Sequence, residues 1–158
     1  TGFGNRQDAL RALDSTLKHA QKRGGAACML LMRLEDFELQ QRQRGNKVMQ
    51  QGVLAFSRRL RQSVRPMDHL CRLQQDHFAL ITYQPQLSHC DPTSFWRLYD
   101  SLNHRAYQTA AGFLSLQVSI ALAASAGGNS ADGMLEQATL ELEQALAEKR
   151  IVSAAASA

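Results

Sequence analysis

The run from Ala26 to Leu34 sets the strongest limit on the fold, because Arg33 is its only polar residue. Gly24 and Gly25 precede the run, and charged residues follow it. A segment this short and of this composition is not a typical helix, whereas a strand buried on both faces has such a continuous apolar pattern. We therefore expect a buried central strand.

Apolar residues at helical intervals predict four helices, around residues 10–20, 49–64, 95–102 and 135–145. The first is expected to end at Arg23-Gly24-Gly25. The second is expected to end before Pro66, because proline moves the preceding Arg65 out of the α region.

Two short strands, 69–73 and 78–83, flank a tight connection at residues 74–76, which is the pattern of a β-hairpin. Alternating apolar residues predict one further strand over 114–122. Helices and strands interleave around this hairpin. We therefore predict an α+β fold (an α/β sandwich) whose central mixed, mostly antiparallel sheet has about five strands flanked by helices.

With 44% hydrophobic and 20% charged residues, the 158-residue chain has the composition of one compact domain. We expect this domain over residues 1–150, followed by a C-terminal tail or linker over 151–158. No apolar run approaches the roughly 20 residues that span a bilayer. We expect a cytoplasmic location, which includes the cytoplasmic part of a membrane-anchored protein.

The basic residues concentrate between Arg42 and Arg72, and the net charge is +4. Either an anionic partner or a solvated helix face accounts for this cluster. Because no nucleic-acid reading motif accompanies the charge, we expect no nucleic-acid partner. The three cysteines have no CxxC spacing, so we expect reduced thiols.

Five segments, in order along essentially the whole chain, resemble motifs of the GGDEF domains of bacterial cyclic di-GMP signalling proteins. They are Thr-Gly-Phe-Gly-Asn-Arg (1–6), Arg-Leu-Glu-Asp-Phe (33–37), Arg-Leu-Gln-Gln-Asp-His-Phe (72–78), Val-Ser-Ile-Ala (118–121) and the helix 138–145. The resemblance implies a nucleotidyl cyclase/GGDEF-like fold, with the predicted hairpin at the former active site.

The chemistry of GGDEF cyclases needs two metal ions, held by carboxylates, that polarise the phosphates of GTP. By this resemblance, Arg33 replaces the aspartate of the first strand, and His77 replaces the acidic fourth residue of the hairpin motif. Asp76 is then the one expected carboxylate that remains, and a single carboxylate rarely retains magnesium against its hydration shell. We predict a degenerate site without metal or required cofactor.

The resemblance also implies that substrate contacts are lost. Gln74 and Gln75 add side chains where the family has glycines beside the phosphates, whereas Phe78 keeps the last residue of the motif. Guanine-reading and lysine positions of the family are occupied by Gln41, Arg42, Asn46, Gln50 and Leu146. We therefore predict that this domain is not an enzyme, which leaves open another enzymatic domain in the parent protein.

The segment Arg65-Pro66-Met67-Asp68 resembles the family's RxxD inhibitory site (I-site), in the expected register before the hairpin. Arginine can bind the O6 and N7 atoms of guanine, and a carboxylate can accept from N1 and N2. We predict cyclic di-GMP binding by Arg65 and Asp68, with Arg61 and Arg97 as further contacts. In the alternative interpretation, Asp68 pairs locally with Arg65 or Arg72 and binds no ligand.

Two other residue groups are weaker candidates for a site. The cysteines and histidines His69, Cys71, His77, His89 and Cys90 lack the spacing of a zinc site, so we predict no metal there. Trp96 and Tyr99 could stack on a base, but their helical spacing favours the edge of the core.

The sequence thus predicts a catalytically inactive regulatory or receptor module that binds cyclic di-GMP. The alternative is a nucleotide-free pseudoenzyme that transmits a signal by protein contact. By the resemblance, its partners would be an adjoining EAL phosphodiesterase-type domain, a membrane sensor, a partner protein or a second copy in a homodimer.

Overall fold

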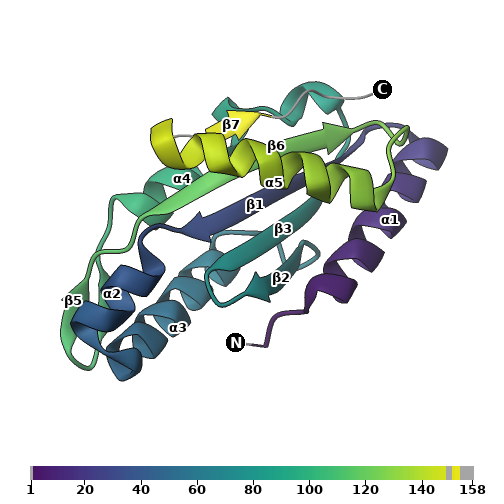
Figure 1. The fold of residues 1–158 in the computed structure, drawn as a ribbon. Coiled ribbons are helices and arrows are strands. Elements are labelled where there is room, and N and C mark those ends of the chain that lie inside the picture. Colours follow the sequence, from purple (N-terminus) through teal and green to yellow (C-terminus); the bar gives the residue numbers. More distant parts are fainter. Residues whose placement is uncertain (1, 149–150, 154–158) are drawn as a thin grey trace.

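The computed structural model describes residues 2–148 and 151–153. Its centre is a five-stranded sheet in the order β2-β3-β1-β6-β7, drawn in Figure 1. The strands are β1 (Ala26–Leu34), β2 (His69–Gln74), β3 (His77–Gln84), β6 (Val118–Ser125) and β7 (Ile151–Ser153). Only the β6–β7 pairing is parallel among these neighbours, which confirms the predicted mixed, mostly antiparallel sheet.

Helices cover both faces of the sheet. One face carries α1 (Arg6–Arg23) and α5 (Ala131–Glu148), and the other carries α3 (Asn46–Gln62) and α4 (Trp96–Asn103) (Figure 1). A shorter helix, α2 (Phe37–Arg44), connects β1 to α3. The predicted sandwich is therefore confirmed, although α2 itself was not predicted.

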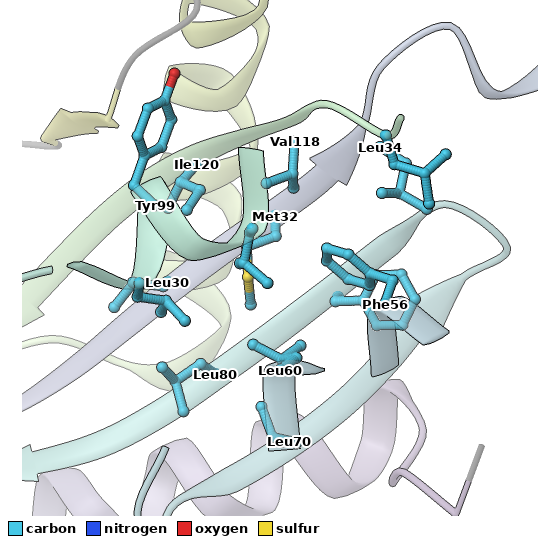
Figure 2. Close-up of a cluster of buried hydrophobic side chains, with 14 of the residues drawn as sticks. Leu30, Met32, Leu34, Phe56, Leu60, Leu70, Leu80, Tyr99, Val118 and Ile120 are labelled. Carbon is cyan, nitrogen blue, oxygen red and sulfur yellow. The ribbon is translucent and has the colours of Figure 1, made fainter. Parts of the chain in front are cut away.

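The apolar run is the central strand, β1, because its alternate side chains enter two different cores. Leu30, Met32 and Leu34 belong to the core under α3, where Figure 2 shows them near Phe56 and Leu60. The intervening residues Ala27, Met29 and Leu31 belong to the core under α1 and α5. Burial on both faces explains why the strand has no polar alternation.

The N-terminal segment is joined to the edge of the sheet. The N–H of Gly4 donates to the carbonyl of Leu70 at 3.2 Å, and the N–H of Arg72 donates to the carbonyl of Gly4 at 2.7 Å. The next residue, Asn5, forms a capping box with Asp8 at the start of α1. Residue 4 thus covers the otherwise open edge of β2.

The predicted strand over 114–122 is wrong in its extent. β5 (Gly112–Leu114) pairs with β4 (Tyr107–Thr109) in a separate two-stranded sheet, and β6 begins only at Val118. The side chain of Asn103 explains the break, because its Oδ1 accepts from the N–H of Val118 at 2.7 Å. The side chain of Gln117 in turn donates to the carbonyl of Asn103.

The prediction of a tail from residue 151 is also wrong for its first residues. Ile151, Val152 and Ser153 pair in parallel with Ile120–Leu122 of β6 and form the fifth strand. Residues 154–158 lie outside the described residues. Within the described ranges, no helix is both long enough and apolar enough to span a membrane.

Candidate functional site

The end of β1 meets the turn of the β2–β3 hairpin. Arg33 lies opposite His77 in the register of β1 and β3, and the N–H of Leu34 donates to the carbonyl of Asp76 at 2.9 Å. The Asp76 carboxylate lies 3.6 Å from the Nε of Arg33 and 2.8 Å from the Nδ1 of His77. The structure therefore brings these three predicted residues together.

A hollow of about 500 Å³ opens beside Arg33 and Asp76. Glu35, Asp36 and Glu38 also line it, although Asp76 was expected to be the one remaining carboxylate. Glu35 stands at the second aspartate position of the family motif that the segment 33–37 resembles, and this match was the signal that could have identified it. This carboxylate is buried and accepts a hydrogen bond of 2.7 Å from Ser119. In residues 2–148 and 151–153, no group of three or more His, Cys, Asp or Glu side chains could hold a metal ion.

A second hollow, of about 510 Å³, lies between α2, α3 and the hairpin. No carboxylate of the described residues lines it. Its polar residues are Gln41, Gln50, Arg72, Gln74 and Gln75, and its apolar residues are Phe37, Met49, Val53, Leu54 and Leu73. Four glutamines from three segments, α2, α3 and the hairpin, therefore converge here.

By the resemblance, three other residues replace family residues, and none is among the described residues that line this second hollow. Arg42 lines the hollow beside Arg33, and Asn46 lines neither hollow. Leu146 is in α5, but its side chain lies outside the described part of the structure.

Arg72 holds the hairpin turn. Its Nε donates to the carbonyl of Gln74 at 3.3 Å, and its Nη2 donates to the carbonyl of Gln75 at 2.6 Å. Burial lowers the pKa of the Arg72 guanidinium, and the nearby charge of Asp76 opposes that shift. These hydrogen bonds hold the Arg72 side chain at the hairpin turn, and it does not pair with Asp68.

Arg65 and Asp68 pair with each other at the turn between α3 and β2. The Nη2 of Arg65 lies 3.2 Å from Oδ1 of Asp68, and the Arg65 N–H donates to Oδ2 at 3.0 Å. The hydroxyl of Thr82 donates to Asp68 Oδ1 at 2.8 Å and also accepts from Arg65. Thr82 was not predicted, because it belongs to this site only through the register of β2 and β3.

The two members of this pair differ in exposure. The side chain of Asp68 is 7% exposed, whereas that of Arg65 is 46% exposed. The Asp68 carboxylate accepts four hydrogen bonds, which is about its full capacity. Three come from Nε, Nη2 and the main-chain N–H of Arg65, and one comes from the hydroxyl of Thr82. The local pairing that the sequence analysis gave as an alternative is therefore present.

The two further predicted arginines differ in position. Arg61 is near the pair, because its Nη1 donates to the main-chain carbonyl of Asp68 at 3.3 Å. Arg97 is exposed on α4, and no hydrogen bond or ion pair within the described ranges joins it to Arg65 or Asp68. Its predicted role stays a prediction.

Trp96 and Tyr99 do stack, with ring centroids 5.3 Å apart and an interplanar angle of 26°. Tyr99 is buried, and burial, followed by the nearby charge of Glu35, raises the pKa of its hydroxyl. Trp96 is 53% exposed. The pair therefore lies at the edge of the core.

Residues 1–151 match the sequence family described as "Diguanylate cyclase, GGDEF domain". The chain belongs to the GGDEF family. No curated protein matches this GGDEF domain at a significant level.

Solved structures show the same fold at low sequence identity. The GGDEF domain of DgcB from Caulobacter crescentus, in complex with c-di-GMP, superposes with a TM-score of 0.85 at 18% identity, covering 97% of this chain and 89% of that one. SiaD from Pseudomonas aeruginosa, a diguanylate cyclase in complex with its activator SiaC, has a TM-score of 0.85 at 21% identity, covering 98% of this chain and 60% of that one. The GGDEF domain of FimX from Pseudomonas aeruginosa has a TM-score of 0.81 at 15% identity, covering 97% and 95%.

Proposed function

We propose that this GGDEF domain makes no cyclic di-GMP and acts as a regulatory module in cyclic di-GMP signalling. The observation that supports this proposal is the ion pair between Arg33 and Asp76 at the end of β1. A guanidinium beside the hairpin carboxylate repels a divalent cation and already neutralises the negative charge that would attract it. Without that cation, the charge that develops on GTP phosphates during transfer is not stabilised.

The hollow between α2, α3 and the hairpin also supports the loss of catalysis. Among the described residues, its lining has no carboxylate to accept from the N1 and N2 donors of guanine. The turn beside it carries the side chains of Gln74 and Gln75, which occupy space close to the backbone. Both changes weaken the binding of a GTP substrate.

We infer that cyclic di-GMP binds at Arg65 and Asp68. The guanidinium of Arg65 is nearly half exposed, and its Nη1 donates no hydrogen bond to any described residue. It can therefore donate to a guanine edge or a phosphate oxygen. Because Arg65 itself occupies Asp68, a guanine base must displace this side chain before it reaches the carboxylate.

The nucleotide-free alternative is favoured by the occupied acceptors of Asp68. In that case the Arg65, Asp68 and Thr82 network only fixes the turn that precedes β2. The domain would then act by contact with another domain or protein.

Calorimetric titration of cyclic di-GMP into the purified domain tests the receptor. We expect saturable binding that is lost in Arg65→Ala and retained in the control Arg23→Ala, which changes an exposed arginine at the end of α1. Asp68→Ala should also abolish binding, provided that circular dichroism shows a folded variant. Absence of heat for the wild-type domain at ligand concentrations far above micromolar would favour the contact module.

Incubation of the domain with GTP and Mg²⁺, followed by chromatography of the nucleotides, tests the loss of catalysis. We expect no cyclic di-GMP. Appreciable product would contradict our interpretation of Arg33 and His77, whatever the titration shows.

A further inference from the structure

The solvent face of α3 carries a basic stripe with a leucine in it. At about 100° per residue, four exposed residues fall within an arc of about 60°: Lys47, Leu54, Arg58 and Arg61. Leu54 is 42% exposed. None of the three cations pairs with a carboxylate of the described residues, and Arg61 donates only to a main-chain carbonyl.

Hollows flank this basic stripe on both sides. Three of them, of about 510, 520 and 420 Å³, share Leu54 as a lining residue. The two that flank the middle of α3 also share Arg58. No aspartate or glutamate in the described part of the chain lines any of the three, so the surface favours an acidic partner with an apolar side chain for the hollows.

The chain itself offers a partner of this kind on α5. Four of its exposed residues fall within an arc of about 80°: Asp132, Glu136, Leu140 and Glu143. Leu140 is 65% exposed, and none of the three carboxylates pairs with a cation of the described residues. This acidic stripe cannot meet α3 of its own molecule, because the two helices cover opposite faces of the sheet (Figure 1).

The spacing of two of the three charged residues on each stripe matches when the helices are antiparallel, whereas Glu143 and Lys47 do not face each other. The two helices are placed antiparallel, with Leu54 opposite Leu140. Glu136, four residues before Leu140, then faces Arg58, which is four residues after Leu54. Asp132, eight residues before Leu140, faces Arg61, which is seven residues after Leu54. At about 1.5 Å of rise per residue, these offsets agree to about 1.5 Å.

We propose that α3 of one copy of this chain binds α5 of a second copy, with Leu140 in the hollows beside Leu54 and the acidic stripe against the basic stripe. The contact joins two different surfaces, so it repeats from head to tail. Exposed ion pairs are individually weak and are screened by salt. The association is therefore reversible, favoured by high protein concentration and weakened by salt.

Sedimentation velocity from about 10 µM to about 1 mM protein at low salt tests the contact. We expect the weight-average sedimentation coefficient of the wild-type domain to rise with concentration and to fall back in about 0.5 M salt. Arg58→Glu and Glu136→Arg should each remain monomeric. The control Arg23→Glu changes an exposed arginine outside both stripes by the same charge and should associate as the wild type does.

Charge reversal on both sides makes the test specific. The double variant Arg58→Glu/Glu136→Arg should regain association, and so should an equimolar mixture of the two single variants. Melting temperatures near the wild-type value would show that the single variants are folded. A wild-type domain that stays monomeric at about 1 mM and low salt, or single variants that associate as the wild type does, would overturn the proposal.

Discussion

The guanidinium of Arg33 faces the carboxylate of Asp76 across the end of β1, with Nε 3.6 Å from Oδ2. The other carboxylate oxygen, Oδ1, lies 2.8 Å from the Nδ1 of His77. The Arg33 side chain is 40% exposed, so solvent screens the pair, and its contribution to stability is small. The ion pair matters mainly because it opposes the binding of a divalent cation at this edge of the sheet.

We predict that Arg33→Asp changes the response of the domain to divalent cations. Without added metal, a second carboxylate beside Asp76 repels the first and lowers the melting temperature by a few degrees. Mn²⁺ should restore this loss, because the two carboxylates can then share a cation with Glu35 nearby. Thermal denaturation with and without Mn²⁺ measures the effect, and the wild-type domain should not respond. A Mn²⁺-dependent rise in the wild-type domain would contradict the prediction.

Asp68→Ala should destabilise the domain by about 2–3 kcal/mol. The substitution leaves the hydroxyl of the buried Thr82 and the N–H of Arg65 without their acceptor. Urea denaturation measures the free energy of unfolding. Asp14→Ala, which removes an exposed aspartate paired with Lys18, is the matched control and should cost less than about 1 kcal/mol. Equal losses in the two variants would show that the Asp68 network adds no stability.

Gly25→Ala should cost far more stability than Gly24→Ala. Both glycines have a positive φ, of 86° and 79°, so both substitutions strain the backbone by about 1 kcal/mol. A Cβ on Gly24 meets open space, whereas one on Gly25 would lie 2.4 Å from the carbonyl oxygen of Gln84. We expect an additional loss of about 2 kcal/mol for Gly25→Ala in urea denaturation. Similar losses would mean that β3 shifts freely away from the new methyl group.

Tyr107 should make the domain sensitive to alkaline pH. Burial raises the pKa of its hydroxyl to about 12, although the guanidinium of Arg59, 3.7 Å from the ring centroid, opposes the shift. The folded state therefore keeps a proton that the unfolded state loses near pH 10. The stabilising contribution is complete below about pH 10 and disappears as the pH rises towards 12.

The variant Tyr107→Phe isolates this effect. It loses the hydrogen bond from the Tyr107 hydroxyl to the carbonyl of Leu102 and should be about 1 kcal/mol less stable at neutral pH. Its free energy of unfolding should decline less than that of the wild type between pH 10 and 12. Parallel pH profiles for the two proteins would contradict the assigned pKa.

The elements with strong apolar patterns were predictable from the sequence. β1, the hairpin, α1, α3 and α5 lie close to where these patterns placed them. α2 had no such signal, because Phe37 is its only buried residue. β4, β5 and β7 each contain three residues, which is too short for a periodic pattern, and the break before β6 depends on the distant side chain of Asn103.

Several residues of the candidate site could be predicted from the sequence, but Thr82 and Glu35 were missed, and the contacts could not be predicted. Motif positions identified Arg33, Asp76 and His77, which the structure brings together. The pairing of Arg65 with Asp68 was one of two alternatives, because a tetrad of residues does not reveal whether its charges face a ligand or each other. Thr82 could not be identified, since it is fourteen residues from Asp68 and approaches only through strand pairing.

The hydrogen bonds of Gly4 give the start of the domain a mechanical connection to the hairpin. Gly4 is joined to Leu70 and Arg72 of β2, and Arg72 is joined to the carbonyls of Gln74 and Gln75. The path from α1 to the turn that carries Asp76 is thus a short series of hydrogen bonds along one sheet edge. Tension or torsion applied at the beginning of α1 would therefore reach this turn without first passing through the centre of the sheet.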